Sequence, residues 1–327
     1  MALTFGVAYL SVGTVAQAQQ AEQTGQAFTI SPPLLELSAD PGDTVSATLK
    51  FTNVSQGNLS VTTEFNDFGA KNETGEPNII FDTEEGSPES LRNWIAEQGD
   101  FDVAAGETIE VTFPIRVPAD AEPGGHYAVI RFTGTASGTD GNEVALSASI
   151  GTLVLLTVSG DIREEAGLEE LYAAAPDFSR ATLFENGPIN IVERIRNTGN
   201  LHIRPTGELT VKDMFGNIVS TSRVNGSPDE EKNKPKSVLP GSVRRFDQKI
   251  DINNGWMFGK YDATVTLSYG TDASKALTGT TSFWVIPYKL ITIGLFAAVA
   301  LFFLSRFMLQ RYNERIIKKA ASNNKKH

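Results

Sequence analysis

The sequence predicts an all-β protein, with two tandem β-sandwich domains followed by one transmembrane α-helix. Two observations lead to this fold class. Between residues 27 and 283, apolar and polar residues alternate in many short segments, which is the period of strands that bury one face. From Leu290 to Leu304, by contrast, every side chain except Thr292 is apolar, as is typical of a helix surrounded by lipid.

The first sandwich is predicted from residues 27–160. Alternation is clear from Val45 to Phe51 and from Val111 to Val117, and a Pro-Gly-Gly turn at 123–125 leads into the next alternating segment. Leu153–Val158 is almost continuously apolar, which indicates a central strand covered on both faces. Short strands at this spacing, separated by Gly and Pro turns, indicate a sandwich.

The second sandwich is predicted from residues 176–283. Its clearest alternating segment is Tyr261–Tyr269, and Asp213–Asn217 is typical of the turn in a hairpin. Glu164–Tyr172 lies between the two regions, and we predict that it forms a helical or irregular linker.

The two regions share an order of turn and strand signals. Each has a strand that ends in asparagine, at Asn53 and at Asn197, and each has a later Gly-x-Tyr strand start, at Gly125–Tyr127 and at Gly259–Tyr261. Asn, Gly and Tyr are ordinary turn and strand residues, so chance is the alternative explanation. We predict that the two sandwiches are related in structure.

The apolar stretch and its flanks reach the ~20 residues that cross a bilayer. Trp284 and Tyr288 stand at one end, where amphipathic rings prefer the headgroup level. Basic residues dominate the other end: Arg306, Arg311, Arg315, Lys318, Lys319, Lys325 and Lys326. This asymmetry predicts a cytoplasmic C-terminus, with the sandwiches outside the cell membrane. A buried core helix is the alternative, but its apolar character on every face disfavours it.

At the N-terminus, Leu3–Val15 is a short apolar run followed by Ala16-Gln17-Ala18, the small-x-small pattern of signal peptidase cleavage. The run has no basic residue before it, and a second membrane helix is the alternative. The predicted organisation is a signal peptide at 1–18, a flexible segment at 19–26, the first sandwich at 27–160, a linker at 161–175, the second sandwich at 176–283, the transmembrane helix at 284–306 and a basic cytoplasmic tail at 307–327.

Composition excludes several classes of function. The chain has no cysteine, so it has neither disulfides nor thiolate zinc sites. The net charge is −11 although the C-terminal tail is basic, so the outer part is acidic. A nucleic-acid partner, which needs a basic surface, is therefore not expected.

No catalytic motif is present. The histidines are His126, His202 and His327, and the sequence lacks HExxH, GxSxG and P-loop patterns. We predict no catalysis and no cofactor, with an unrecognised extracytoplasmic enzyme as an alternative class. No metal site is predicted either, because Asp82–Glu85 and Asp251–Gly255 have oxygen ligands but lack the spacing of a calcium loop.

Several motifs resemble those of the WxL-interacting proteins. The matching segments are Phe28–Pro32, Pro41–Asp43 and, most specifically, Val117–Tyr127, with weaker matches at Asn197–His202 and Pro205–Gly207. That family consists of surface proteins of Gram-positive bacteria. The resemblance implies a peptidoglycan-binding first domain, a second domain that binds host or partner proteins, immunoglobulin-like sandwiches and a C-terminal membrane anchor.

Aromatic residues supply the candidate binding sites. Trp94, His126 and Tyr127 lie nearest the family-like turn, and exposed aromatics beside polar groups suit stacking on sugar rings. We expect Tyr127 to be exposed, while a core or lid position is the alternative for Trp94. Trp256 and Phe258 form an apolar loop tip that either docks on a partner or caps the end of a sandwich.

The leading hypothesis is a non-catalytic, single-pass surface protein, with a role in cell adhesion, that contacts the membrane through Leu290–Leu304. Its sandwiches bind peptidoglycan or another wall polymer, another surface protein, or both. The alternative is an extracytoplasmic assembly chaperone or scaffold, because pilus-chaperone-like sandwiches have similar strand and turn patterns and bind partners by sharing strands.

Overall fold

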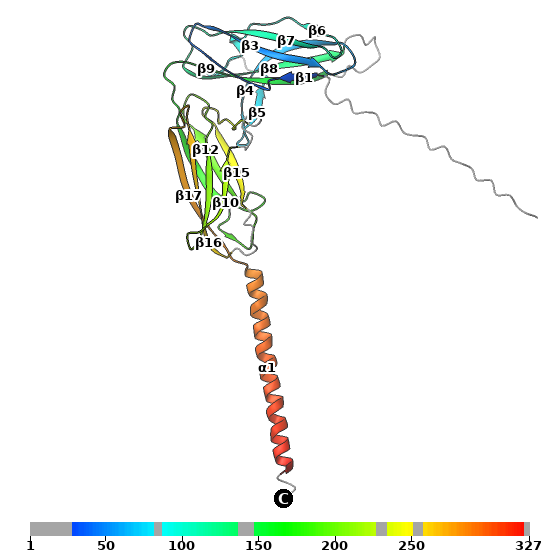
Figure 1. Ribbon diagram of the computed structural model, residues 1–327, viewed down its shortest axis with the longest axis vertical. Coiled ribbons are helices and arrows are strands. Elements are labelled where there is room, and N and C mark those ends of the chain that lie inside the picture. The colour runs from blue at the N-terminus through cyan, green and yellow to red at the C-terminus, as the bar shows by residue number, and fades with distance from the viewer. Residues whose placement is uncertain (1–27, 82–86, 137–146, 227–233, 251–257, 324–327) are drawn as a thin grey trace, which may run out of the picture.

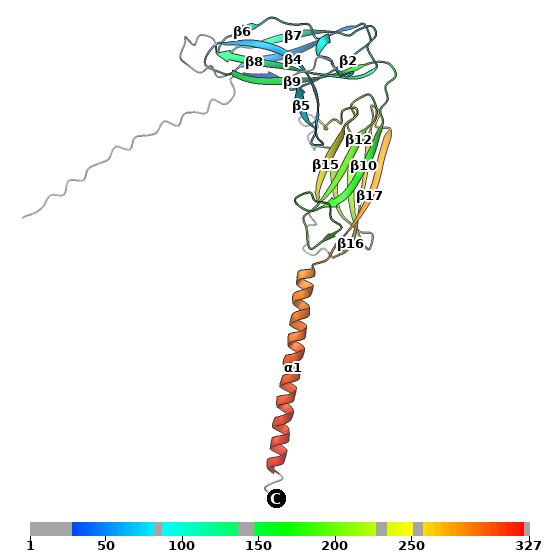
Figure 2. The ribbon, with the colours of Figure 1, turned by 180° about the vertical axis from the view of Figure 1, so that it is seen from behind.

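The computed structural model describes residues 28–81, 87–136, 147–226, 234–250 and 258–323. Strands dominate this part of the chain, and its long α-helix is at the C-terminus (Figure 1). The predicted fold class is confirmed, since β-sandwiches are followed by one apolar helix. In both views the first sandwich lies across one end of the second, and the helix leaves the other end (Figure 1 and Figure 2).

The first sandwich packs a three-stranded sheet, ordered β1-β3-β7, against a larger sheet ordered β2-β9-β8-β4-β5, with β6 paired to β4. Its elements are β1 (Phe28–Ser31), β2 (Leu34–Ala39), β3 (Thr44–Asn53), β4 (Leu59–Lys71), β5 (Glu76–Ile80), the 3-10 turn η1 (Arg92–Trp94), β6 (Phe101–Val103), β7 (Thr108–Arg116), β8 (Gly124–Ala136) and β9 (Ser147–Val158). Phe28, Phe51, Phe113 and Phe132 are fully buried between the sheets. Phe28 stacks on Phe51 with ring centroids 4.6 Å apart.

The chain changes sheets between β1 and β2. β1 pairs antiparallel with β3 in the smaller sheet, whereas β2 pairs parallel with β9 in the larger one. Leu153–Val158 therefore lies between β2 and β8, as the apolar run predicts. The preceding half of β9, Ser147–Thr152, pairs with β8 on one side and with no described strand on the other. Among the described strands, that half of β9 is therefore an open sheet edge.

The second sandwich packs a three-stranded sheet, ordered β10-β12-β15, against a five-stranded sheet, ordered β11-β17-β16-β13-β14. Its strands are β10 (Ala166–Ala174), β11 (Leu183–Phe184), β12 (Ile189–Asn197), β13 (Thr206–Asp213), β14 (Ile218–Val224), β15 (Val243–Ile250), β16 (Gly259–Tyr269) and β17 (Lys275–Val285). It has an apolar core of its own, in which Ile189, Ile191, Leu209, Val265 and Phe283 are fully buried.

The prediction of a linker at 161–175 is wrong for most of these residues. Ala166–Ala174 is β10, which pairs with β12 along its whole length. A register shift between Leu168 and Glu170 interrupts the ladder, and such a bulge breaks the two-residue alternation by which strands are recognised in a sequence. Leu168 and Leu171 nevertheless pack against the second core.

The helix α1 (Tyr288–Asn323) begins later than the expected boundary at 284 and ends beyond 306. Trp284 belongs to β17, where it pairs with Lys260 of β16 and Leu183 of β11. The sheet continues to Val285 because it has pairing partners on both sides. Pro287, whose backbone carbonyl accepts a hydrogen bond from the Ile291 N–H, comes immediately before the helix. Tyr288–Ile317 is long and apolar enough to cross a membrane.

The predicted similarity of the two domains includes a buried asparagine at the end of a strand. Asn53 and Asn197 are both fully buried. The Asn53 Nδ2 donates to the carbonyl oxygens of Gly57 and Val103 at 2.8 and 3.0 Å. The Asn197 Nδ2 donates to those of Leu201 and Val238 at 2.8 and 2.9 Å. Each side chain ties its own turn to a segment distant in sequence, which explains why asparagine occupies both positions.

We predict that Asn53→Ala and Asn197→Ala each lower the free energy of unfolding by roughly 1–3 kcal/mol, because buried carbonyl groups lose their donors. Urea unfolding of the full chain in detergent measures the loss, and hydrogen exchange should locate it in the first sandwich for one variant and in the second for the other. Asn78→Ala, at an exposed position on β5, is the control. A loss no greater than that of the control would contradict this account.

A carboxyl group, that of Glu193, is buried in the second core. Glu193 on β12 is fully buried and is paired in register with Leu171 and Phe246. Neither of its carboxyl oxygens has a hydrogen-bond partner among the described residues. Burial, helped by the negative charge of Asp247, raises the pKa of Glu193 to about 8, so the group is mainly protonated at neutral pH.

Because the pKa of Glu193 is higher in the folded state than its ordinary value of 4.5, the folded protein holds this proton more tightly than the unfolded chain. The free energy of unfolding should therefore fall as pH rises from about 4.5 to about 8, by at most about 1.4 kcal/mol per pH unit. Glu193→Gln removes the ionisation, so we expect it to flatten this dependence and to stabilise the protein at pH 8. Denaturant titrations across the window, with the exposed Glu208→Gln as control, test the prediction. An unchanged slope in Glu193→Gln would refute it.

Candidate functional site

The predicted ligand-binding residues do not form one exposed group. His126 and Tyr127 are neighbours on β8 and are only 3% and 4% exposed. The His126 Nε2 lies 2.9 Å from the Glu122 carbonyl oxygen, and the half-buried Trp94 of η1 covers the imidazole with ring centroids 4.4 Å apart. Trp94 and His126 thus close one end of the first sandwich.

The prediction that Tyr127 is exposed is wrong. Its ring lies between Phe68 of the first sandwich and His202 of the second, with ring centroids 6.0 and 5.8 Å away. Its hydroxyl accepts a hydrogen bond from the His202 backbone N–H at 3.1 Å and lies 3.3 Å from His202 Nδ1. Burial lowers the pKa of His202 to about 4, so the imidazole is neutral at neutral pH. Tyr127 is therefore a contact between the two domains.

Asn200 holds the two domains together next to Tyr127. Its carbonyl oxygen accepts from the Gly125 N–H at 2.8 Å, and its Nδ2 donates to the carbonyl oxygens of Pro123 and Asp161 at 2.9 and 3.0 Å. Gly124 adopts φ 129, and a Cβ there would lie 2.5 Å from the Asn200 oxygen. The Pro-Gly-Gly-x-Tyr run, the most family-like motif in the sequence, thus forms the junction between the sandwiches.

A second set of junction contacts comes from the β4–β5 hairpin. The Glu73 carboxylate accepts from the Arg194 guanidinium, including an Nε–Oε2 hydrogen bond of 2.7 Å, and Arg194 Nη1 also lies 3.0 Å from Glu170 Oε2. The Glu73 carbonyl oxygen accepts from the Arg245 N–H at 2.8 Å. The hydrogen bond from Arg194 is the main reason that the pKa of Glu73 is lowered.

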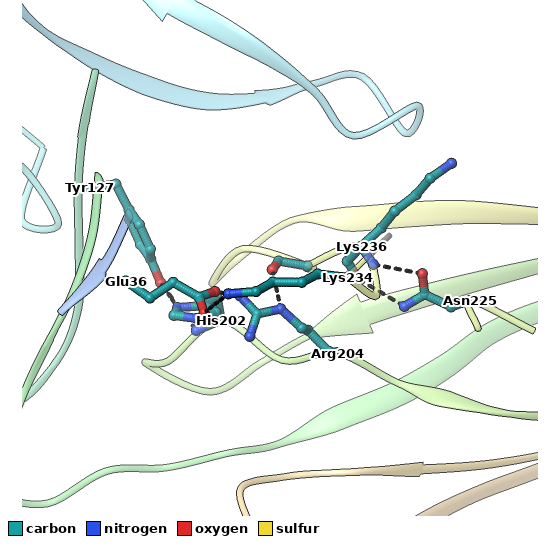
Figure 3. A network of polar contacts seen from close by, with 8 residues as sticks. Glu36, Tyr127, His202, Arg204, Asn225, Lys234 and Lys236 are labelled. Atoms are coloured by element: carbon teal, nitrogen blue, oxygen red, sulfur yellow. Dashed lines mark hydrogen bonds and ion pairs between the residues drawn. The ribbon is translucent and has the colours of Figure 1, made fainter. Parts of the chain in front are cut away.

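A third set surrounds Glu36 of β2, as Figure 3 shows. The Glu36 carboxylate pairs with the Arg204 guanidinium and with Lys234, whose Nζ is 3.1 Å away. The segment that carries Lys234 is held in place by Asn225, whose Oδ1 accepts from the Lys236 N–H at 2.8 Å and whose Nδ2 donates to the Lys236 carbonyl oxygen at 2.8 Å. Burial lowers the pKa of Arg204, but a guanidinium remains charged at neutral pH.

Between these polar contacts lies an apolar cavity of about 190 Å³. Four leucines and one phenylalanine are among its lining residues: Leu34, Phe68, Leu153, Leu155 and Leu239. The first four belong to the first sandwich and Leu239 to the second, so the cavity is a gap in the packing of the junction. Sequence reasoning could not identify this surface, because its residues come from segments far apart in the chain.

The open half of β9 is the other candidate site. The Leu153 N–H donates to the Pro33 carbonyl oxygen on the β2 side at 3.0 Å. Successive backbone N–H groups point to opposite sides of a strand, and the β8–β9 register is continuous, so those of Gly151 and Ser149 point to the same side as that of Leu153. There they meet no described strand. Ser149 and Gly151 are also exposed.

The remaining predicted sites are only partly covered by the structure. Trp256 lies outside the described residues, as do the acidic stretches Asp82–Glu85 and Asp251–Gly255. Phe258 is described and is 59% exposed. Within the described ranges, no group of three or more His, Cys, Asp or Glu side chains is placed to hold a metal ion.

No family model matches the sequence, and no curated protein matches it. Solved structures with a similar fold include the Class 5 fimbriae chaperone CfaA (14% identity, covering 78% of this chain and 98% of that one, TM-score 0.39). Two others are the YadV chaperone (10%, 79% and 100%, TM-score 0.37) and the E. coli chaperone DraB (12%, 79% and 96%, TM-score 0.35). At these identities and TM-scores, the likeness carries no argument about function.

From the geometry of the junction we predict that Tyr127→Phe changes the hydrogen exchange of the His202 amide. This variant keeps the ring but removes the acceptor of the His202 N–H, and a hydrogen bond of this kind contributes about 1 kcal/mol. The His202 amide should therefore exchange with solvent roughly fivefold faster, measured by hydrogen exchange on the full chain. Tyr172→Phe, at a half-buried site next to Arg180, is the control. Equal exchange of the His202 amide in wild type and Tyr127→Phe would show that this bond does not protect it.

Proposed function

We propose that this chain is a non-catalytic, membrane-anchored scaffold or assembly chaperone, which binds an extended segment of another protein outside the cytoplasm. The observation that carries the proposal is the open edge at Ser147–Thr152 of β9. An extended peptide gains main-chain hydrogen bonds by adding a strand to such an edge.

The side chains of this edge are not of the kinds that usually protect against pairing. Edge strands in soluble proteins generally carry Lys, Pro or inward-pointing charges, whereas Ser147–Thr152 reads Ser-Ala-Ser-Ile-Gly-Thr. Ala148 and Ile150 point toward the first core and are half-buried. Together they extend the apolar surface of that core to the edge of the sheet. A partner strand would extend the line of β2 and place its own apolar residues beside Ile150.

The wall-binding hypothesis is a second candidate, supported by the resemblance to WxL-interacting proteins and by a different surface. A polar hollow of about 730 Å³ lies on the first sandwich beside η1. Its lining combines donors and acceptors with one ring: Thr63, Glu64, Phe65, Asn66, Arg92, Asn93, Glu97 and Gln98 are among the residues. Polar groups of this kind bind the hydroxyl groups of sugars. Because this chain is acidic and a cell wall is anionic, binding to the wall would depend on these polar groups and not on net charge.

The test begins by identifying what contacts the edge. A photo-crosslinking amino acid replaces Ser149 in the full chain expressed in its native cells, and the matched control carries it at Ser46, which is exposed on β3 in the other sheet. We expect a protein adduct from position 149 that is absent from position 46. Adducts of equal yield at both positions would argue against a site at the β9 edge.

The second step measures binding of the cross-linked protein to the purified full chain. Ser149→Pro removes an outward-pointing N–H and obstructs the approach of a strand, while Ser149→Thr retains both the N–H and the strand. A loss of about 1.4 kcal/mol would weaken binding tenfold, and we expect at least this for Ser149→Pro and little change for Ser149→Thr. If both variants bind as wild type does, the edge proposal is wrong. Sedimentation of the full chain with purified sacculi, reduced by Asn93→Ala but not by Ser149→Pro, would instead favour the wall polymer.

A further inference from the structure

Large apolar side chains are exposed at the end of the second sandwich from which the helix leaves. They are Leu183, Met214, Phe215, Ile218, Phe258 and Trp284. Phe215 is 81% exposed, more than any other large apolar residue in the described part of the chain, including those of the helix. Contiguous exposed apolar groups of this kind usually mark a contact surface.

The strand register places these side chains at one end of the sandwich. Trp284 is paired with Lys260 on one side and with Leu183 on the other. Asp213, at the start of the hairpin turn that carries Met214 and Phe215, is paired with Tyr261. Met214 also contacts Gly259, since its Cε lies 2.4 Å from where a Cβ of that glycine would be. The hairpin tip and Phe258 are therefore beside the C-terminal end of β17.

The same end is joined to the membrane helix without a flexible spacer. Ile286 donates its N–H to the Phe184 carbonyl oxygen at 2.8 Å, and α1 begins at Tyr288. In the first helical turn, Lys289 Nζ lies 2.5 Å from Glu185 Oε2. The continuous apolar stretch of the helix starts at Leu290, so when the helix crosses a bilayer this end of the sandwich faces the bilayer surface.

We propose that this apolar end is a membrane-docking surface, and that its partner is the headgroup region of the bilayer that α1 crosses. Aromatic rings such as those of Trp284 and Tyr288 prefer that depth. Exposed Phe, Met and Ile side chains next to them gain free energy by leaving water for the boundary between headgroups and acyl chains. The sandwich then rests on the membrane instead of moving freely above it.

The charged side chains at this end of the sandwich indicate which lipids are sufficient for docking. Lys212, Lys249 and Lys260 share this end with Asp213, Asp262 and Glu185, and Lys260 pairs with Asp262 at 2.9 Å. Positive and negative groups are thus mixed. Apolar insertion, and not attraction to anionic lipid, drives the contact, so a zwitterionic bilayer is enough. This inference does not depend on what binds the β9 edge.

The absence of cysteine from the chain permits a direct test. Phe215→Cys and Phe258→Cys, each labelled with an environment-sensitive bimane, are reconstituted as full-length protein in phosphatidylcholine nanodiscs with or without a lipid that carries a shallow nitroxide quencher. Val54→Cys is the matched control, because Val54 is also an exposed apolar residue but lies in the first sandwich. All three sites are exposed, so the substitutions leave the cores intact.

We expect the nitroxide lipid to quench the labels at positions 215 and 258 several-fold more than the label at position 54, with blue-shifted emission at the first two. Adding anionic lipid should change this little. The quencher is carried by the lipid, so quenching reports that the label is near lipid and not that it is near the scaffold protein of the nanodisc. Equal quenching at all three positions, or water-like emission at both 215 and 258, would overturn the proposal.

Discussion

The hydrogen bond between the Gly125 N–H and the Asn200 carbonyl oxygen, with Tyr127 packed beside it, fixes how the two sandwiches lie relative to each other. The close approach requires glycine at position 124, where φ is 129 and a Cβ would overlap the Asn200 oxygen. Polar groups in this contact are largely buried, so leaving one of them unpaired would cost about 1–3 kcal/mol. The ion pairs at the rim contribute less, because Glu73 and Arg194 keep 37% and 22% of their side-chain surface exposed and water screens them. Buried hydrogen bonds and the apolar contacts of Phe68, not the salt bridges, therefore dominate the stability of the junction.

Much of the fold follows from the alternation of apolar and polar residues, which located β3, β7, β8 and β16 and the central position of Leu153–Val158. Tyr127 lies on the face of β8 opposite Ile130 and Phe132, as the alternation along a strand requires. The prediction that Tyr127 is exposed is wrong for a physical reason. A two-residue period shows which face of a sheet a side chain is on, but not whether a second domain covers that face. β10 was missed for a different reason. A bulge at Leu168–Glu170 interrupts the period, and the charged residues there take part in ion pairs that a sequence does not reveal.

The residues of the junction were visible in the sequence, but their role was not. The sequence shows that Asn53 and Asn197 each end a strand, and in the structure Asn197 acts as Asn53 does. Asn200 and His202, which contact the first sandwich, have no such counterpart. Their partners are Pro123, Gly125 and Tyr127, more than 70 residues earlier in the chain. A motif that resembles a wall-binding family thus has a structural role here, so the resemblance of that motif does not by itself locate a ligand.

The β9 edge and the apolar end of the second sandwich are held in fixed positions relative to each other, because one end of β9 is part of the junction between the sandwiches. Val158 pairs with Gly124 at that end, whereas the open half runs from Thr152 to Ser147, about 20 to 36 Å along the strand at ~3.3 Å per residue. Ser147 and Ser149 lie beyond Leu153, which lines the junction cavity. If the helix end of the second sandwich rests on the bilayer, the junction holds the β9 edge at a set height above it. Fixing the edge in this way reduces the freedom that a partner, itself close to the membrane, must lose on binding. The rigid junction and the membrane-docked end then favour the same event, which is capture of an extended chain at the far side of the first sandwich.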